Sequence, residues 1–255
     1  MSQKKALVTG GGKGIGRGIA LALAKAGYDI AVHYGTSRAG AEDMAQQIRE
    51  LGREAITLQA DVKDVAAIRR MFSEYREQFG TIDVLVNNAG ITRLVPFLEV
   101  DEDLWEEVMR TDLRGSFFCA QEAARLMVES ETKGVIIQIS SNHSQGCWPN
   151  ATIYGPAKAG VDKLVRNMAL DLAPHGIRVV GIAPGYTRLE WIPESANERI
   201  AQTAGKIPLQ RFAQPAEIGE AAVFLTSEAA GYITGTTLFM DGGALLPVVP
   251  DNHYT

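Results

Sequence analysis

The chain has 255 residues, 46% of them hydrophobic, and its 30 acidic residues exceed its 25 basic residues to give a formal net charge of −5. A chain of this length forms one large domain or two small ones, and either can bury a sizeable core. The longest cationic runs are the pairs Lys4-Lys5 and Arg69-Arg70. The acidic balance and the absence of a basic cluster disfavour nucleic acid and anionic membranes as partners.

Cysteine usage and the N-terminal sequence predict the compartment. The two cysteines, Cys119 and Cys147, lie far apart, which supports neither a disulfide framework nor a thiolate metal site. The first residues reach a glycine cluster before an apolar secretory segment develops, and no window of about 18 uncharged apolar residues occurs. We therefore expect a cytoplasmic protein with free thiols and no metal.

Short β-branched apolar runs alternate with longer segments of helical period, a pattern typical of a parallel sheet covered by helices. Seven strands are expected, over residues 5–9, 29–34, 55–58, 84–87, 135–140, 178–182 and 237–240. Six helices are expected between them, over residues 15–26, 39–51, 65–79, 104–129, 152–172 and 215–226. No linker or repeat divides the chain, so residues 1–255 are predicted to form one doubly wound α/β domain, with a seven-stranded parallel sheet and helices on both faces.

Residues 184–208 form the irregular region of the sequence, because they mix turn residues with one short amphipathic piece. In an open α/β sheet, a segment that leaves the carboxyl end of a strand overhangs the ligand crevice. Residues 186–208 are therefore expected to form a substrate lid. The C-terminal PVVPDNHYT has no periodicity, and we expect it to be frayed or packed on a partner subunit.

The first strand runs into a glycine-rich loop, Thr9-Gly10-Gly11-Gly12-Lys13-Gly14-Ile15-Gly16-Arg17, which opens a helix. Backbone amides at such a turn, together with the helix N-terminus, hold a pyrophosphate where no Cβ blocks the approach. The fingerprint GxGxxG fits in no frame, and a triphosphate loop requires Ser or Thr where this chain has Gly14. The spacing TGxxxGxG does fit, and its position after a strand predicts a dinucleotide site.

The end of the second strand favours one of the two nicotinamide dinucleotides. An NAD site usually carries Asp or Glu there to accept from the ribose 2′-hydroxyl, but residues 33–41 contain no acid and Tyr34 stands in that place. The side chains that could surround a 2′-phosphate instead are Lys13, Arg17, Ser37 and Arg38. We expect NADP rather than NAD, and the alternative is that these cations are ordinary solvated surface residues.

Tyr154 and Lys158 lie four residues apart at the head of a predicted helix, which places both on one face. A nearby ammonium favours the phenolate, so Lys158 would make Tyr154 a better acid-base catalyst. The pair alone is weak evidence, because such pairs are common on exposed helices. Thirteen residues before Tyr154, however, Ser141 follows the fifth strand at the sheet edge where ligands bind.

These motifs, in this order, resemble the classical short-chain dehydrogenases/reductases over essentially the whole chain. The matching features are TGGGKGIG at 9–16, Asp61-Val62, NNAG at 87–90, Ser141, YGPAK at 154–158, Pro184-Gly185 and ITGTTLFMDGG at 233–243. The resemblance implies a Rossmann-like fold. It also implies an NAD(P)-dependent oxidoreductase that interconverts a secondary alcohol and a ketone, or a sugar hydroxyl and a lactone.

The resemblance implies a role for each matching position. Tyr154 would exchange a proton with the substrate oxygen, Ser141 would hydrogen-bond that oxygen, and Lys158 would bind the nicotinamide ribose beside Tyr154. The other matches would border the cofactor, at its pyrophosphate (Gly10, Gly14, Ile15 and Gly16), its adenine (Asp61 and Val62), along the fourth strand (Asn88 and Gly90) and at its nicotinamide (Pro184 and Gly185).

Two positions depart from the family pattern. The family usually has Asn where this chain has Asp112, and an ionised Asp only accepts hydrogen bonds. Our hypothesis is that Asp112 takes part in catalysis by ordering a water that reaches Lys158 and by holding Lys158 protonated. The threonine often found four residues after Gly185 is Leu189 here, so we expect Thr187 to supply a hydroxyl to the nicotinamide carboxamide.

The loop between Ser141 and Tyr154 is polar, which is unusual for the wall of a lipid pocket. Its SSxH start and Trp-Pro pair resemble the glucose 1-dehydrogenase branch of the family. His143 would hydrogen-bond sugar hydroxyls and Trp148 would stack on a pyranose, unless His143 only pins the loop. The alternative is the 3-oxoacyl-[acyl-carrier-protein] reductase branch, which uses NADPH and shares NNAG, the closing motif and the missing ribose-binding acid.

Two further expectations concern turnover and assembly. A redox sensor that binds the cofactor without turnover is a remote alternative, since it would need neither Ser141 nor the pair Tyr154 and Lys158. The predicted helices over 104–129 and 152–172 carry more apolar residues than one sheet face needs. The resemblance suggests that they pair in a homotetramer, and a small molecule is the expected substrate.

Overall fold

The structure is a computed structural model that describes residues 3–246, so the C-terminal PVVPDNHYT lies outside the described residues. Its strands form one parallel sheet in the order β3-β2-β1-β4-β5-β6-β7. They are β1 (Lys5–Val8), β2 (Asp29–Tyr34), β3 (Ala55–Gln59), β4 (Val84–Asn87), β5 (Val135–Ile139), β6 (Arg178–Pro184) and β7 (Thr237–Met240). The predicted seven-stranded parallel sheet is confirmed.

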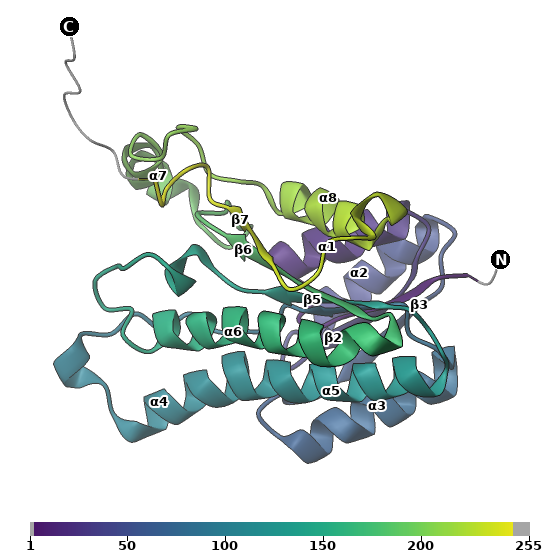
Figure 1. Cartoon of the computed structure of the whole chain (residues 1–255). Coiled ribbons are helices and arrows are strands. Elements are labelled where there is room, and N and C mark those ends of the chain that lie inside the picture. The colour runs from purple at the N-terminus through teal and green to yellow at the C-terminus, as the bar shows by residue number, and fades with distance from the viewer. Residues whose placement is uncertain (1–2, 247–255) are drawn as a thin grey trace, which may run out of the picture.

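Helices cover both faces of this sheet, as Figure 1 shows. They are α1 (Gly14–Lys25), α2 (Arg38–Glu50), α3 (Val65–Phe79), α4 (Glu102–Val108), α5 (Gly115–Glu129), α6 (Tyr154–Leu172), α7 (Asn197–Ala204) and α8 (Pro215–Thr226). α1, α2 and α8 pack on one face, while α3, α5 and α6 pack on the other. Among residues 3–246, no helix combines the length and the apolarity that crossing a membrane requires.

The apolar core is divided between the two faces of the sheet. Along β1, Ala6 and Val8 belong to the cluster under α1, α2 and α8, whereas Leu7 belongs to the cluster under α3 and α5. Because successive strand residues point to opposite faces and both faces are covered, the strands are continuous apolar runs without polar alternation.

Residues 104–129 are helical throughout, as predicted, but they are not one uniform α-helix. α4 ends at Val108, and Met109–Arg114 form a π-helical segment before α5 begins at Gly115. The apolar period continues through this segment, because a π-bulge only widens one turn and adds little to the sequence pattern. The bulge holds the fully buried Asp112, whose carboxylate accepts a hydrogen bond from the backbone of Ile91 at 2.9 Å.

The order of the strands determines where a ligand can bind. β1 leads outward to β2 and β3, and the chain then returns to β4 on the other side of β1. Such a reversal leaves a crevice between the carboxyl ends of β1 and β4, which is where open α/β sheets bind ligands. The glycine loop follows β1 and Asn88 follows β4, so the fold brings both to this crevice.

Candidate active site

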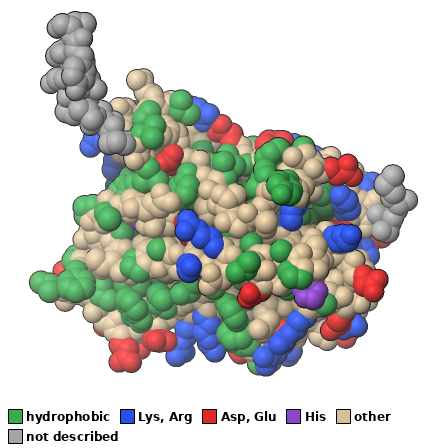
Figure 2. Space-filling view, viewed as in Figure 1, with side chains coloured by type: hydrophobic (Ala, Val, Ile, Leu, Met, Phe, Trp, Pro, Cys, Tyr) green, Lys and Arg blue, Asp and Glu red, His purple; other side chains and the backbone are tan. Residues whose placement is uncertain are grey.

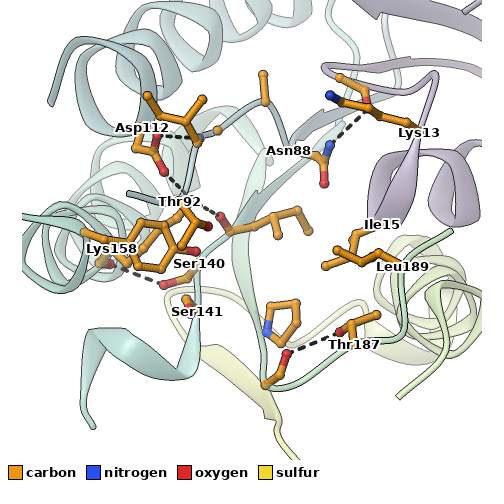
Figure 3. A pocket seen from close by; sticks show the side chains of 18 of the residues that line it. Lys13, Ile15, Asn88, Thr92, Asp112, Ser140, Ser141, Lys158, Thr187 and Leu189 are labelled. Atoms are coloured by element: carbon orange, nitrogen blue, oxygen red, sulfur yellow. Dashed lines mark hydrogen bonds and ion pairs between the residues drawn. The ribbon is translucent and has the colours of Figure 1, made fainter. Parts of the chain in front are cut away.

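A cavity of about 290 Å³ lies at the carboxyl ends of the central strands, and Figure 3 shows the side chains that line it. It brings together most of the residues predicted for the site, which are Gly10, Lys13, Ile15, Asn88, Gly90, Asp112, Ser141, Tyr154, Lys158, Pro184, Gly185 and Thr187. From the expected lid, Leu189 and Trp191 complete the wall. The motifs that lie far apart in the sequence therefore meet around one space.

A second cavity of about 280 Å³ adjoins the first over the ends of β2 and β3. Its walls include Asp61 and Val62, the two residues that the resemblance assigns to the adenine. Both cavities share Gly10, Lys13 and Gly90, so they meet at the glycine loop. Five of the predicted site residues line neither cavity, namely Gly14, Gly16, Arg38, His143 and Trp148.

The glycine loop is held closely against the end of β4. Asn88 donates from its amide to the carbonyl of Thr9 at 2.9 Å, and the Thr9 hydroxyl accepts from the backbone of Asn88 and Ala89, both at 2.9 Å. Gly16 permits this approach, because a Cβ there would lie 2.5 Å from Nδ2 of Asn88. Gly10 has φ +64°, a conformation that glycine adopts without strain. The loop is a backbone cradle that larger residues would fill.

His33, at the carboxyl end of β2, connects this loop to the wall of the second cavity. Its Nδ1 accepts a hydrogen bond from the backbone N–H of Gly10 at 3.1 Å, so Nε2 carries the proton and donates to the carbonyl of Ala60 at 3.0 Å. Burial lowers the pKa of His33 to about 4, although the Ala60 carbonyl and Asp61 oppose this effect. His33 was not among the predicted site residues, because its sole signal in the sequence is a polar side chain in an otherwise apolar run.

From the lowered pKa of His33 we predict that the protein becomes less stable as the pH falls. The unfolded chain takes up a proton near the ordinary pKa of 6.5, but folded His33 does not until about pH 4, so protons favour unfolding throughout this window. We expect the free energy of unfolding to fall by about 2 kcal/mol between pH 7 and pH 5 from this residue alone. Urea unfolding of the wild type and His33→Asn at both pH values measures it. Equal pH dependence in the two proteins would contradict the assignment.

Lys158 lies one helical turn after Tyr154 on α6, fully inside the protein. Its Nζ donates to the carbonyl of Ile139 at 3.1 Å and lies 5.7 Å from the centre of the Tyr154 ring. Burial alone would lower the pKa of Lys158, but Asp112, Tyr154 and Asp162 together outweigh burial and hold that pKa above its ordinary value. A permanent positive charge therefore lies beside the Tyr154 phenol.

Asp112 reaches Lys158 directly. Its Oδ2 lies 3.2 Å from Nζ of Lys158, a close ion pair whose alignment falls short of a hydrogen bond, and Figure 3 shows the two side chains facing each other. The exposed fractions of these side chains are 0% for Asp112 and 6% for Lys158. At this distance the carboxylate needs no bridging water to hold the ammonium charged.

Ser141 and Thr187 supply the hydroxyl groups of the first cavity. The Ser141 oxygen accepts from the backbone N–H of His143 at 3.2 Å, and it lines the same cavity as Tyr154. The Thr187 hydroxyl donates to the carbonyl of Gly185 at 3.2 Å. Leu189 lies next to Ile15 in Figure 3, in the wall of the same cavity, and presents no hydroxyl there.

The aromatic side chains of the polar loop contact one another. The His143 ring stacks on Trp148 with centroids 4.2 Å apart and meets the Tyr154 ring edge-on at 5.3 Å. Half-burial lowers the pKa of His143, which favours a neutral ring. His143 therefore packs between neighbours of the polar loop and contacts both the Tyr154 ring and the Trp148 ring.

The cations expected around a 2′-phosphate all contact neighbours. Arg38 pairs with Glu42 at 2.7 Å, Arg17 pairs with Asp43 at 2.7 Å, and Nζ of Lys13 lies 5.6 Å from the centre of the Trp191 ring. The two ion pairs lie at the surface, where water screens them, so a dianion could replace the carboxylates.

Comparison with known proteins agrees with this geometry. The family model described as "Enoyl-(Acyl carrier protein) reductase" matches residues 10–244. The 3-oxoacyl-[acyl-carrier-protein] reductase FabG of Staphylococcus aureus (strain Mu50) is 40% identical over 240 residues, which cover 94% of this chain and 97% of the relative. Glucose 1-dehydrogenase 2 of Bacillus subtilis (strain 168) is 36% identical over 249 residues, which cover 96% of each chain.

A solved structure extends the agreement to three dimensions. A short-chain type dehydrogenase/reductase from Mycobacterium marinum superimposes with a TM-score of 0.90 at 35% identity, covering 96% of this chain and 97% of that one. The sequence match, the shared fold and the Ser141, Tyr154 and Lys158 cluster point the same way. The chain belongs to the short-chain dehydrogenase/reductase family and is an NAD(P)-dependent oxidoreductase that acts on CH–OH groups.

Proposed function

We propose that this enzyme oxidises or reduces a small polar substrate, a sugar or a polyol, at one carbon–oxygen bond and uses NADP. The observation that carries the proposal is the single cavity that joins the glycine loop to Ser141, Tyr154 and Lys158. The site fits a dinucleotide, since the first cavity reaches the glycine loop at Gly10 and the second cavity continues from Gly10 toward Asp61. When bound, the cofactor supplies or accepts the hydride.

The residues of the chain handle the proton. Tyr154 donates its hydroxyl proton to the forming alkoxide in reduction and accepts it in oxidation, while Ser141 holds the same substrate oxygen. The ammonium of Lys158 stabilises the phenolate that Tyr154 becomes, and Asp112 keeps that ammonium charged.

Two features support a polar substrate and NADP. Ser141 of the catalytic cavity is followed directly by the polar residues Asn142, His143 and Ser144, and the relative from Bacillus subtilis is named glucose 1-dehydrogenase 2. Tyr34 and Ser37 line the second cavity where an NAD enzyme usually carries an acid, and Arg17 and Arg38 lie on the adjoining helices.

The second candidate is reduction of a 3-oxoacyl thioester with NADPH, and the 40% identity to FabG of Staphylococcus aureus favours it. Initial rates of nicotinamide absorbance separate the two. Sugars and polyols are supplied with NADP or NAD, and a 3-oxoacyl thioester with NADPH or NADH. We expect turnover of the sugar class with a lower KM for NADP. Turnover of the thioester alone would replace the first candidate by the second.

We further propose that the enzyme is a homotetramer. Figure 2 shows hydrophobic side chains gathered over the end of the molecule that Figure 1 labels α4. The exposed side chains Phe97, Leu98 and Trp105 lie in or next to α4, and Phe117 on α5 continues the apolar surface. Light scattering of the purified protein should give four times the 27.5 kDa chain mass, and a monomer would contradict the proposal.

A further inference from the structure

The segment after β6 folds back onto the glycine loop. Oε1 of Glu190 accepts a hydrogen bond from the backbone N–H of Gly14 at 2.8 Å, although the two residues are 176 positions apart. The Trp191 ring lies on Gly14 so closely that a Cβ there would be 2.7 Å from it. Nζ of Lys13 lies 5.6 Å from the centre of the same ring. Two adjacent lid residues thus contact both the first residue of α1 and the cation before it.

These contacts occupy the place that a phosphate would need. Gly14 begins α1, where backbone N–H groups without helical partners and the positive end of the helix dipole attract anions. Here the anion is a carboxylate from the chain itself. A phosphate oxygen and the Glu190 oxygen would compete for the same backbone N–H group.

The two cavities lie on either side of Gly14. The first cavity reaches Gly10 from the side of Tyr154, and the second reaches it from the side of Asp61. Gly14 lines neither cavity, because Glu190 and Trp191 cover it. A dinucleotide that spans both cavities must pass its diphosphate over this covered point.

We propose that Glu190 and Trp191, together called the plug, occupy the position that the diphosphate of the cofactor needs. The lid must then move away from Gly14 before a dinucleotide binds across both cavities. The inference rests on dinucleotide binding by this family and is independent of the substrate. The plug is weak, because Trp191 is 56% exposed and solvent reaches Glu190 as well. A lid that is closed about nine-tenths of the time lowers the apparent affinity about ten-fold, since only the open fraction binds.

The first test uses the protein without any dinucleotide. Amide hydrogen exchange of Gly14 is measured in the wild type, in Glu190→Ala and in Glu194→Ala. Glu194→Ala is the matched control, because Glu194 lies four residues further along the same lid and its replacement removes an equal charge. We expect Gly14 to exchange several-fold faster in Glu190→Ala only. Unchanged exchange in Glu190→Ala would overturn the plug.

The second test measures association of NADP and NAD by stopped-flow Trp fluorescence. We expect Glu190→Ala to bind about three- to ten-fold faster and correspondingly tighter than the wild type, because its lid opens more often. Glu194→Ala should behave as the wild type, which separates the contact from simple loss of negative charge. Slower or weaker binding by Glu190→Ala would show that Glu190 clamps the bound cofactor, and this result also overturns the plug.

The two tests distinguish failure of the plug from failure of cofactor binding. If neither dinucleotide binds to any of the proteins, both the proposed cofactor and the plug are wrong, whatever the exchange rates. If the wild type and both variants bind equally fast, the cofactor assignment stands and the plug alone is wrong.

Discussion

Replacing Tyr154 with Phe is expected to lower turnover by about 10²–10⁴-fold, the usual contribution of a positioned general acid or base. The substitution removes the hydroxyl and keeps the ring, which meets His143 edge-on at 5.3 Å and lies 5.7 Å from Nζ of Lys158. The packing at the head of α6 is therefore preserved. Dinucleotide affinity should stay within about five-fold, because at most a neutral hydrogen bond worth about 1 kcal/mol is removed.

The measurement combines initial rates at saturating substrate with a fluorescence titration of NADP. Tyr232→Phe is the control, since Tyr232 is exposed and lies outside both the lid and the catalytic cavity, and it should keep its full rate. A Tyr154→Phe protein that turns over at the wild-type rate would exclude Tyr154 as the proton donor. A variant that folds but no longer binds NADP would instead give the phenol a role in holding the cofactor.

Much of the fold is predictable because it depends on local pattern. The buried runs of β1, β4 and β5 are continuous because helices cover both faces, and their lengths and spacing predict a parallel sheet. The π-helical segment Met109–Arg114 was not predictable, because its extra residue per turn leaves the apolar pattern of α4 and α5 nearly unchanged. What stabilises it is a long-range contact between Asp112 and the backbone of Ile91.

The site also combines residues that the sequence predicts with contacts that it does not predict. Ser141, Tyr154 and Lys158 are recognisable because their spacing is local and strand ends meet at one edge of the sheet. The contacts of His33 with Gly10 and of Glu190 with Gly14 join segments that the sequence keeps 23 and 176 residues apart. Such contacts depend on how loops return to the sheet, and neither residue type nor spacing predicts them.

Removing the carboxylate of Asp112 is expected to lower the stability of the protein and to shift the pH dependence of its activity. Asp112→Leu leaves the buried ammonium of Lys158 without its partner, and breaking a buried pair from one side typically destabilises a protein by about 3–5 kcal/mol. Asp112→Asn keeps the shape and an oxygen that can accept from the Ile91 backbone at the present 2.9 Å position. We therefore expect Asp112→Asn to lose part of this stability, and Asp112→Leu, which also loses the hydrogen bond from Ile91, to unfold at a still lower urea concentration.

The charge of Lys158 determines the direction of the pH effect. In the wild type the pKa of Lys158 lies above its ordinary value, because Asp112 and the weaker effects of Tyr154 and Asp162 together outweigh the opposing effect of burial. In Asp112→Asn only burial and weaker charges remain, so this pKa falls and Lys158 loses its proton at a lower pH. If Tyr154 needs that ammonium, the alkaline limb of kcat/KM must move to lower pH.

Asp162→Asn is the control for a general charge effect. Asp162 also raises the pKa of Lys158, but it contributes less to this pKa than Asp112 or Tyr154 does. We expect a small alkaline shift in Asp162→Asn and a large one in Asp112→Asn, measured as kcat/KM against pH at constant ionic strength. An Asp112→Asn profile that coincides with the wild type would mean that the ion pair only stabilises the π-helical segment. In that case Asp112→Leu would still unfold early, while the remaining activity would keep the wild-type pH dependence.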